Sequence, residues 1–179
     1  MHELHLFFTV YDHKIAELVA KLPQWLAPIM RAATLIGQPV FVVLVALIVV
    51  VTARLRGHPR IAYAYLAGLV GFGGNTLLKS IFHRARPQTI YAENMKIKSY
   101  SFPSGHAYGG MVFYGLLAYL AYKYLPQPWN LIATALLAVL IFLIGLSRVY
   151  LGAHFPSDVT AGWVLGAITL ILIIVLIKP

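Results

Sequence analysis

Five long apolar runs without a charged residue constrain this chain more than any other feature of its sequence. They cover Leu35–Ala53, Ile61–Leu78, Ala107–Tyr122, Trp129–Leu146 and Val159–Ile177. Each run is close to the roughly 20 residues that an α-helix needs to cross a bilayer. Only 11% of all residues are charged, whereas soluble domains average about 25%. The sequence therefore predicts an all-α integral membrane bundle in which five helices cross the membrane.

A sixth span is expected between Leu22 and Gly37, which would give about six transmembrane helices. This segment contains Arg31 and is less apolar than the five runs, so an amphipathic helix at the membrane interface is the alternative. These spans use nearly the whole chain of 179 residues, and we expect residues 1–179 to form one membrane-embedded domain. The N-terminus has no recognisable removable signal peptide, and the absence of cysteine excludes disulfides and a thiol nucleophile.

Polar residues gather in three short strings at the ends of the apolar runs. KSIFHRARP covers Lys79–Pro87, PSGH covers Pro103–His106, and SRVYLGAHFPSD covers Ser147–Asp158. Between the second and the third string the chain crosses the membrane twice, with a short turn at Lys123–Pro128. The three polar strings are therefore predicted to lie on the same membrane face, where an active site at a bilayer surface would need them.

The polar strings contain the residue types that can transfer a phosphoryl group without a metal ion. Guanidinium groups bind phosphate oxygens in a bidentate fork, lysine adds a point charge, and imidazole serves as nucleophile or proton donor near neutral pH. The residues of these types are Lys79, Arg86, Arg148, His106, His154 and Asp158. Metal-free phosphate ester hydrolysis is therefore the predicted chemistry.

Two of the strings are expected to open helices in ways that suit an anion. Pro103 is a favourable first helical residue, so the amides of Ser104, Gly105 and His106 should point out of a helix N-terminus toward a phosphate. Pro156 should begin the last helix, with Asp158 in its first turn. Asp158 follows His154 by four residues, so its carboxylate could accept Nδ1–H and leave Nε2 as the attacking lone pair.

The patterns K-x6-RP, PSGH and SR-x5-H-x3-D resemble the three signature motifs of the type 2 phosphatidic acid phosphatase (PAP2) superfamily, over roughly residues 60–165. The resemblance implies a membrane lipid phosphatase whose substrate is undecaprenyl diphosphate, phosphatidylglycerol phosphate, phosphatidic acid or lipid A. It implies that His154 attacks phosphorus to form a phosphohistidine, that Asp158 orients the imidazole, and that His106 protonates the leaving oxygen. The phosphate ligands that it implies are Lys79, Arg86, Arg148, Ser104 and the amide of Gly105.

The longest polar stretch of the chain, Gln88–Phe102, lies between two of the motifs. We expect it to cover the site and to contact the substrate headgroup, and a solvated loop without that role is the alternative. The candidate recognition residues are Tyr91, Glu93, Lys96, Lys98 and Tyr100.

The orientation in the membrane follows from the positive charges. Arg54, Arg56 and Arg60 form a compact basic turn on the face opposite the polar strings, and basic loops favour the cytoplasm. The polar strings also carry cations, but several of these are assigned to the substrate. The predicted site therefore faces outward from the cell membrane.

Other functions remain possible from the residues alone. His106, His154 and Asp158 could instead ligate a metal ion, although few acidic residues are available to complete such a site. The soluble haloperoxidase relatives suggest that vanadate should occupy the same cradle and inhibit. A protein that binds or transports phosphate headgroups without hydrolysis would need the cations but no positioned nucleophile. We expect no cofactor, no metal and no nucleic-acid partner.

Overall fold

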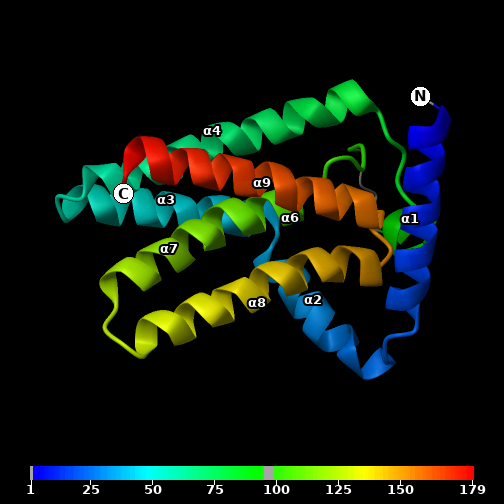
Figure 1. Ribbon diagram of the computed structural model, residues 1–179, viewed down its shortest axis with the longest axis horizontal. Coiled ribbons are helices and arrows are strands. Elements are labelled where there is room, and N and C mark those ends of the chain that lie inside the picture. Colours follow the sequence, from blue (N-terminus) through cyan, green and yellow to red (C-terminus); the bar gives the residue numbers. More distant parts are fainter. Residues whose placement is uncertain (1, 95–98) are drawn as a thin grey trace.

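The computed structural model describes residues 2–94 and 99–179, and every element in that part of the chain is helical. Helices α3, α4, α7, α8 and α9 run along the long axis of the molecule, whereas α1 lies across one end of them (Figure 1). The elements are α1 (His2–Ala20), η1 (Gln24–Leu26), α2 (Ala27–Ile36), α3 (Pro39–Leu55), α4 (Pro59–Phe82), α5 (Ile90–Asn94), α6 (Gly105–Gly109), η2 (Gly110–Tyr114), α7 (Gly115–Tyr124), α8 (Trp129–Tyr150) and α9 (Pro156–Ile177).

Proline marks the beginning of four of these helices. Pro28, Pro39, Pro59 and Pro156 lie in the first turns of α2, α3, α4 and α9. Proline is tolerated there because the first amides of a helix have no partner within it, and its fixed φ suits the helical backbone. The predicted start of the last helix at Pro156 therefore agrees with the structure.

Fewer helices have the length and hydropathy of a membrane span than the sequence predicts. Within the described residues, α4, α8 and α9 are long and apolar enough to cross a membrane. A fourth span is possible if residues 24–36 and α3, which meet at a bend of 50°, are taken together as one broken span. The predicted separate span between Leu22 and Gly37 is thus a short helix bent against α3, in the geometry of a broken span or a re-entrant loop. The count of six spans is not confirmed.

The helix over 105–124 departs from the regular pattern. The sequence predicts one apolar span at Ala107–Tyr122, and the structure places three consecutive helical pieces there, α6, η2 and α7. The middle piece, η2, is a π-helix. Such segments appear mostly as single-turn bulges within α-helices and often lie near functional sites.

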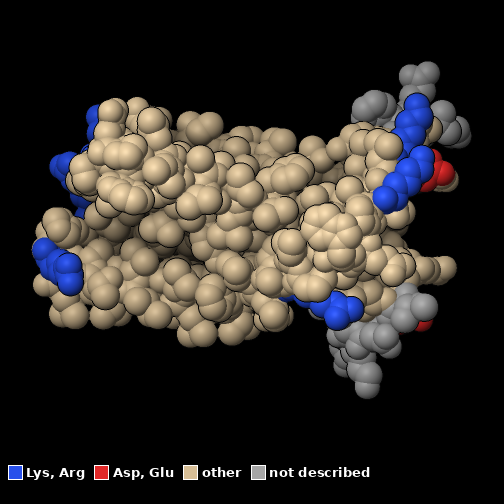
Figure 2. All heavy atoms as spheres, turned by 90° about the horizontal axis from the view of Figure 1, so that it is seen from below, with Lys and Arg blue, Asp and Glu red and all other residues tan. Residues whose placement is uncertain are grey.

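Charged side chains occupy the two ends of the molecule. Figure 2 shows lysines and arginines at both ends of the visible face and a broad band without charged residues between them. The apolar residues Val70, Leu136, Phe142 and Leu172 are more than half exposed although they belong to the spanning helices. Exposed apolar surface of this kind is expected where lipid covers a protein. The chain is therefore a multi-pass membrane protein.

Close packing of α9 against the start of α6 holds the site together. A Cβ added at Gly162 would lie 2.7 Å from the backbone oxygen of Ser104 and 3.0 Å from the Cβ of Ala107. Backbone atoms cannot swing away as a flexible side chain can. Gly162 is thus required for the distance between α9 and the PSGH segment.

We expect Gly162→Ala to lower both stability and activity. Overpacking of a tight contact costs about 1–3 kcal/mol, and here it would also move the start of α6 relative to His154. The matched control is Gly73→Ala on α4, where an added Cβ meets nothing within 4 Å. The midpoint of thermal unfolding and the rate of phosphate release should both fall for Gly162→Ala and stay unchanged for Gly73→Ala. Equal behaviour of the two variants would contradict this account.

Candidate active site

The three polar strings meet around one cavity of about 220 Å³. They arrive from the end of α4, the start of α6 and the turn between α8 and α9. The lining residues are Pro39, Lys79, Arg86, Ser99, Gly105, His106, Arg148 and His154. Six of these are predicted site residues, so side chains separated by up to 75 positions share one small cavity.

The turn between α8 and α9 carries His154 on a tightly bonded backbone. Gly152 adopts a left-handed conformation with φ of 71°, which a residue with a Cβ rarely takes. The amides of Ala153 and His154 both donate to the carbonyl oxygen of Arg148, at 2.9 and 3.2 Å. Thr89 Oγ1 donates to the carbonyl of Gly152 at 2.9 Å. His154 is therefore held at a fixed position against the end of α8.

Asp158 contacts His154 as the spacing predicts. Its Oδ2 lies 3.4 Å from His154 Nδ1 and accepts the amide of Phe155 at 2.9 Å. Asp158 is completely buried, and His154 is 3% exposed. The carboxylate caps the first turn of α9 and lies where it could accept a hydrogen bond from Nδ1–H of His154.

Arg86 occupies the other side of the His154 ring. Its Nη1 donates to the carbonyl of Ala153 at 2.9 Å and lies 3.2 Å from His154 Nε2. Its Nε donates to the carbonyl of Ser99 at 2.9 Å. With Nδ1–H directed at Asp158, Nε2 is the acceptor of the Arg86 contact.

The environment of His154 favours the neutral imidazole. Burial lowers its pKa to about 4, and the nearby Arg86 and Arg148 lower it as well, against the opposing influence of Asp158. Near neutral pH the ring is therefore uncharged, and its Nε2 retains a lone pair that can attack an electrophile.

Arg148 is a fully buried cation with unused donors. Its Nη1 donates to Thr34 Oγ1 of α2 at 2.8 Å, and that hydroxyl in turn lies 2.8 Å from Ser147 Oγ. Its Nε and Nη2 are buried and make no hydrogen bond of normal geometry among the described residues, although Tyr91 lies near enough to interact with the guanidinium. Burying unpaired guanidinium donors is costly, so this arrangement suits a site built to receive an anion.

Lys79 lines the same cavity but is tied to the backbone. Its Nζ donates to the carbonyls of Pro103, Tyr100 and Ser101, at 2.6, 3.0 and 3.3 Å. These acceptors all precede α6. The ammonium group thus fixes the segment that leads into PSGH and adds positive charge to the cavity wall.

The residues of the PSGH string differ in their position relative to the cavity. Gly105 and His106 line the cavity, and His106 Nε2 is buried without a partner among the described residues. Ser104 is buried, does not line the cavity, and accepts the amide of Ala107 at 3.4 Å as the helix cap. Its own amide donates to the carbonyl of Asp158 at 3.0 Å. Ser104 therefore joins α6 to α9 in this structure.

The candidate headgroup residues divide between two places. Tyr91 interacts electrostatically with Arg148, close to the site. Glu93 and Tyr100 line a neighbouring cavity of about 310 Å³, which shares Arg86 and Ser99 with the first. Lys96 and Lys98 lie outside the described residues. Whether this loop recognises a headgroup stays a prediction.

Several residues at the site escape prediction from the sequence. Arg84 donates from Nη1 to Asp158 Oδ1 at 2.7 Å and from Nη2 to Asp12 Oδ2 at 2.6 Å. Thr34 supports Arg148, as described above. Arg84 stands two residues before Arg86 in the same string, and Asp12 is one of only five acidic residues, so position and scarcity were the available signals.

The part of the chain that the structure describes contains no cluster of side chains that could bind a metal ion. No three side chains of His, Cys, Asp or Glu come together there. His154 and Asp158 bond to each other and to arginines. Independence from metal ions stays a prediction.

Comparison with known proteins gives a consistent result. Residues 59–179 match the model of the PAP2 superfamily. The chain is 33% identical to phosphatidylglycerophosphatase B of Bacillus subtilis, over 90% of this chain and 81% of that protein. It is 42% identical to an undecaprenyl-diphosphatase of Sulfolobus acidocaldarius, over 43% of this chain and 34% of that protein.

Solved structures agree with these relatives. The crystal structure of a transmembrane PAP2-type phosphatidylglycerolphosphate phosphatase from Bacillus subtilis has a TM-score of 0.77 and 28% identity. The matched region covers 96% of this chain and 92% of the Bacillus subtilis protein. LpxE of Aquifex aeolicus has the same fold, with a TM-score of 0.66 at 20% identity, over 90% of this chain and 93% of that one.

Proposed function

The chain belongs to the PAP2 superfamily and is a membrane lipid phosphatase, and on that premise we propose that it hydrolyses its substrate through a phosphohistidine at His154. One observation carries the proposal. The neutral imidazole of His154 has Nδ1 directed at Asp158 and Nε2 directed at a cavity that also holds Lys79, Arg86 and Arg148.

The first displacement uses the lone pair of His154 Nε2. It attacks phosphorus, the bond from phosphorus to the lipid oxygen breaks, and His106 gives its proton to the departing oxygen. Arg86 leaves Nε2 for a phosphate oxygen, while the free donors of Arg148 and the amide of Gly105 bind the others. Asp158 stabilises the positive charge that develops on the imidazole.

The second displacement restores the enzyme. Water attacks the phosphohistidine, His106 accepts the proton from that water, and the bond from phosphorus to Nε2 breaks. Inorganic phosphate leaves, and His154 is neutral again. Splitting hydrolysis into two displacements at preorganised cations suits phosphomonoesters, which are among the slowest substrates to react in water.

The pH profile of kcat/KM should be bell-shaped. With a pKa of about 4, His154 is protonated and unreactive only at the acid end, so the rate should fall as the pH drops toward that value. His106 must carry a proton in the first displacement, and burial together with the nearby cations lowers its pKa well below its usual value. The rate should therefore fall again as the pH rises, and this fall should begin on the acid side of neutral pH. A rate that rises continuously from about pH 5 to about pH 9 would contradict both roles.

Among the predicted substrates we favour phosphatidylglycerophosphate. A relative that covers 90% of this chain is named phosphatidylglycerophosphatase B, and the solved structure with the TM-score of 0.77 is a phosphatidylglycerolphosphate phosphatase. The test is phosphate release by purified protein in detergent with EDTA, across phosphatidylglycerophosphate, undecaprenyl diphosphate, phosphatidic acid and lipid A. Faster release from any of the other three lipids would replace this choice, and loss of release in EDTA would overturn metal independence.

The loop over 88–102 would then recognise the headgroup. Glu93 and Tyr100 support this through the cavity that adjoins the site. Replacing Lys96 and Lys98 together with alanine should reduce the preference for phosphatidylglycerophosphate over phosphatidic acid. An unchanged ratio of the two rates would remove the recognition role.

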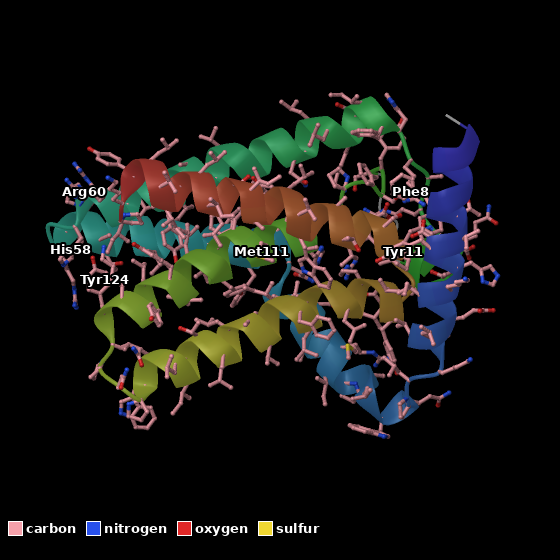
Figure 3. All side chains as sticks on the ribbon, viewed as in Figure 1. Phe8, Tyr11, His58, Arg60, Met111 and Tyr124 are labelled. Carbon is pink, nitrogen blue, oxygen red and sulfur yellow. The ribbon has the colours of Figure 1, made fainter. Side chains whose placement is uncertain are left out.

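We further propose that the site faces outward from the cell membrane. Figure 3 shows His58 and Arg60 at the end of the molecule opposite Phe8 and Tyr11, which lie on the helix that crosses the site end. The basic turn with Arg54, Arg56 and Arg60 is thus at the far end from the cavity, as the positive-inside rule requires for a cytoplasmic turn. Because the chain has no cysteine, single cysteines can be introduced at the exposed positions 93 and 56 and treated with a reagent that does not cross the membrane. Reagent added outside the cell should label position 93 and leave position 56 unlabelled. Labelling of position 56 alone would reverse the orientation.

A further inference from the structure

A continuous chain of charged and titratable side chains runs from α1 to the proposed nucleophile. Its members are Asp12, Arg84, Asp158 and His154, joined by contacts of 2.6, 2.7 and 3.4 Å. We propose that Arg84 and Asp12 are positioning residues of the hydrolysis, Arg84 by fixing the carboxylate of Asp158 and Asp12 by fixing Arg84. The inference rests on the proposed role of His154.

Arg84 is held from three directions. Its Nη1 donates to Asp158 Oδ1 and to Ser157 Oγ, both at 2.7 Å, and its Nη2 donates to Asp12 Oδ2 at 2.6 Å. The guanidinium also lies over the ring of Phe155, 4.2 Å from its centre. Such a fork leaves the carboxylate of Asp158 a single orientation, with Oδ1 on Arg84 and Oδ2 facing His154.

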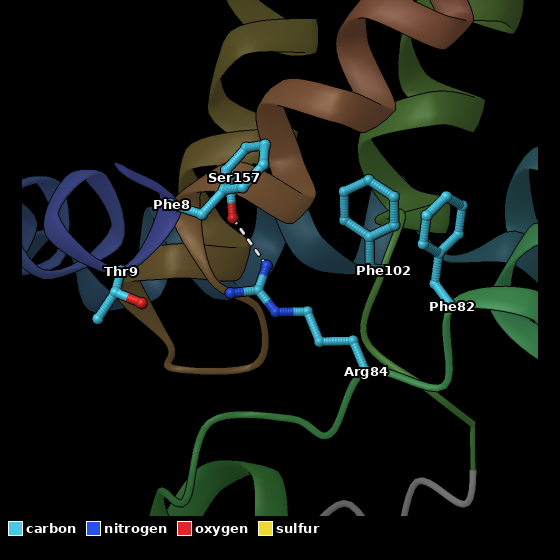
Figure 4. Close-up of a pocket in the computed structure, with 6 residues that line it drawn as sticks. All are labelled: Phe8, Thr9, Phe82, Arg84, Phe102 and Ser157. Atoms are coloured by element: carbon cyan, nitrogen blue, oxygen red, sulfur yellow. Dashed lines mark hydrogen bonds between the residues drawn. The ribbon is translucent and has the colours of Figure 1, made fainter. Parts of the chain in front are cut away.

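Arg84 and Arg86 perform different jobs although they are two residues apart. Arg86 lines the phosphate cavity, whereas Arg84 does not. Arg84 lines a pocket of about 300 Å³ together with Phe8, Thr9, Phe82, Phe102 and Ser157, and it shares the neighbouring cavity of about 310 Å³ with Arg86. Figure 4 shows Arg84 reaching across that pocket to Ser157, with Phe82 and Phe102 on the other side of its side chain. Arg84 therefore acts on the reaction through Asp158, without lining the cavity that would hold the phosphate.

Asp12 uses both of its oxygens to join α1 to the first turn of α9. Its Oδ1 accepts the amide of Ser157 at 2.7 Å, and its Oδ2 accepts the Ser157 hydroxyl at 2.8 Å as well as Arg84. The Asp12 side chain is 7% exposed, and that of Asp158 is fully buried. A carboxylate at a helix N-terminus is favourable, and here it holds the turn that carries Asp158.

The charges in this chain balance in a way that suits His154. Asp12, Arg84 and Asp158 together carry −1 + 1 − 1 = −1, so Asp158 keeps its negative charge for the imidazole although it is paired with an arginine. Without Asp12, Arg84 would neutralise Asp158. Without Arg84, two carboxylates would face each other in a buried space. Loss of either residue should therefore shift the protonation of His154, in opposite directions.

Other charged or titratable groups near His154 also influence its protonation. They come from every element that packs against it, namely Lys79 of α4, Arg86 of the following loop, His106 of α6, Arg148 of α8 and Asp158 of α9. All of them stay unchanged in the variants below. A change in the acid limb of kcat/KM then reports Asp12 and Arg84, because that limb follows the free enzyme.

The experiment compares Arg84→Met, Arg84→Lys and Asp12→Asn in the full chain, with phosphatidylglycerophosphate in detergent micelles. Arg84→Met should lower kcat about 10-fold to 100-fold with KM changed less than about 3-fold, since a misplaced group costs rate and not binding. It should also move the acid limb to higher pH. Arg84→Lys should return the limb toward the wild-type position with only part of the rate, because lysine keeps the charge without the fork. Asp12→Asn should lower kcat and move the limb to lower pH.

Tyr11→Phe is the matched structural control. It removes a 2.9 Å contact of Tyr11 with Thr160 that also joins α1 to α9, without changing a charge. This variant should lower the midpoint of thermal unfolding and leave the acid limb of the kcat/KM profile at its wild-type pH. The positioning role would be overturned if the acid limb stayed at the wild-type pH in both Arg84→Met and Asp12→Asn. It would also be overturned if these variants raised KM and left kcat unchanged. If His154→Ala stays active, the phosphohistidine proposal fails first; if it is inactive while Arg84→Met matches the wild type, only the present inference fails.

Discussion

Replacing His154 by alanine should lower kcat by at least about 10³-fold on every lipid that the wild type hydrolyses. The variant loses the neutral imidazole that lines the cavity together with three cations and has the Asp158 carboxylate next to its Nδ1. The cations themselves remain, so the phosphate headgroup should still bind. Phosphate release measures the first effect, and competition with vanadate for the cavity measures the second.

The control for this variant is His58→Ala. His58 is exposed, lies at the opposite end of the molecule and should be replaceable without loss of rate. Incubation of the wild type with a phosphate-labelled lipid, followed by rapid denaturation at alkaline pH, should trap label on His154. Residual hydrolysis of His154→Ala at a tenth of the wild-type rate would be incompatible with covalent catalysis at this residue.

Arg148→Met should separate stability from activity. Arg148 is fully buried, no carboxylate of the described residues lies within ion-pair distance of it, and its guanidinium donates to Thr34 and interacts with Tyr91. An apolar side chain of similar length removes an unpaired buried charge, so the thermal unfolding midpoint should stay the same or rise. The rate should nevertheless fall about 10²–10³-fold, as when one preorganised donor to a developing anion is lost.

Arg148→Lys tests the geometry of the same interaction. Lysine keeps the charge but presents a single ammonium group in place of the fork, and it cannot contact Thr34 and a phosphate in the same way. We expect most of the rate to be lost in this variant too. Full activity of Arg148→Lys would mean that charge alone matters, and a large drop in the unfolding midpoint of Arg148→Met would mean that Arg148 is chiefly structural.

The sequence predicts the site better than it predicts the path of the chain. The motif residues could be found because phosphate chemistry restricts which side chains are useful, and one string reveals little without the others. The structure indeed gathers Lys79, His106, Arg148 and His154 around one cavity. The helical class follows as directly from the apolar runs, since a backbone in lipid must satisfy its own hydrogen bonds.

The features that escaped prediction depend on contacts between distant segments. Hydropathy cannot show that residues 24–36 bend by 50° against α3, because bending changes packing and not composition. The helix cap that the Ser104 hydroxyl forms with the amide of Ala107 is a contact that sequence analysis did not foresee, and phosphate binding by Ser104 stays a prediction. Asp12 and Arg84 are 72 positions apart, and neither belongs to a pattern that would suggest their pairing.

The contact between Arg86 and His154 Nε2 also bears on how turnover ends. In this structure the guanidinium contacts His154 Nε2 and the carbonyls of Ala153 and Ser99. Under the proposed mechanism it therefore has partners to return to when phosphate departs. Product release in that mechanism lets Arg86 exchange its bonds to phosphate for these contacts. Inorganic phosphate should accordingly be a weak inhibitor of an enzyme that holds its substrate by several cations, and the resting nucleophile is shielded from adventitious electrophiles until a phosphate ester draws Arg86 away.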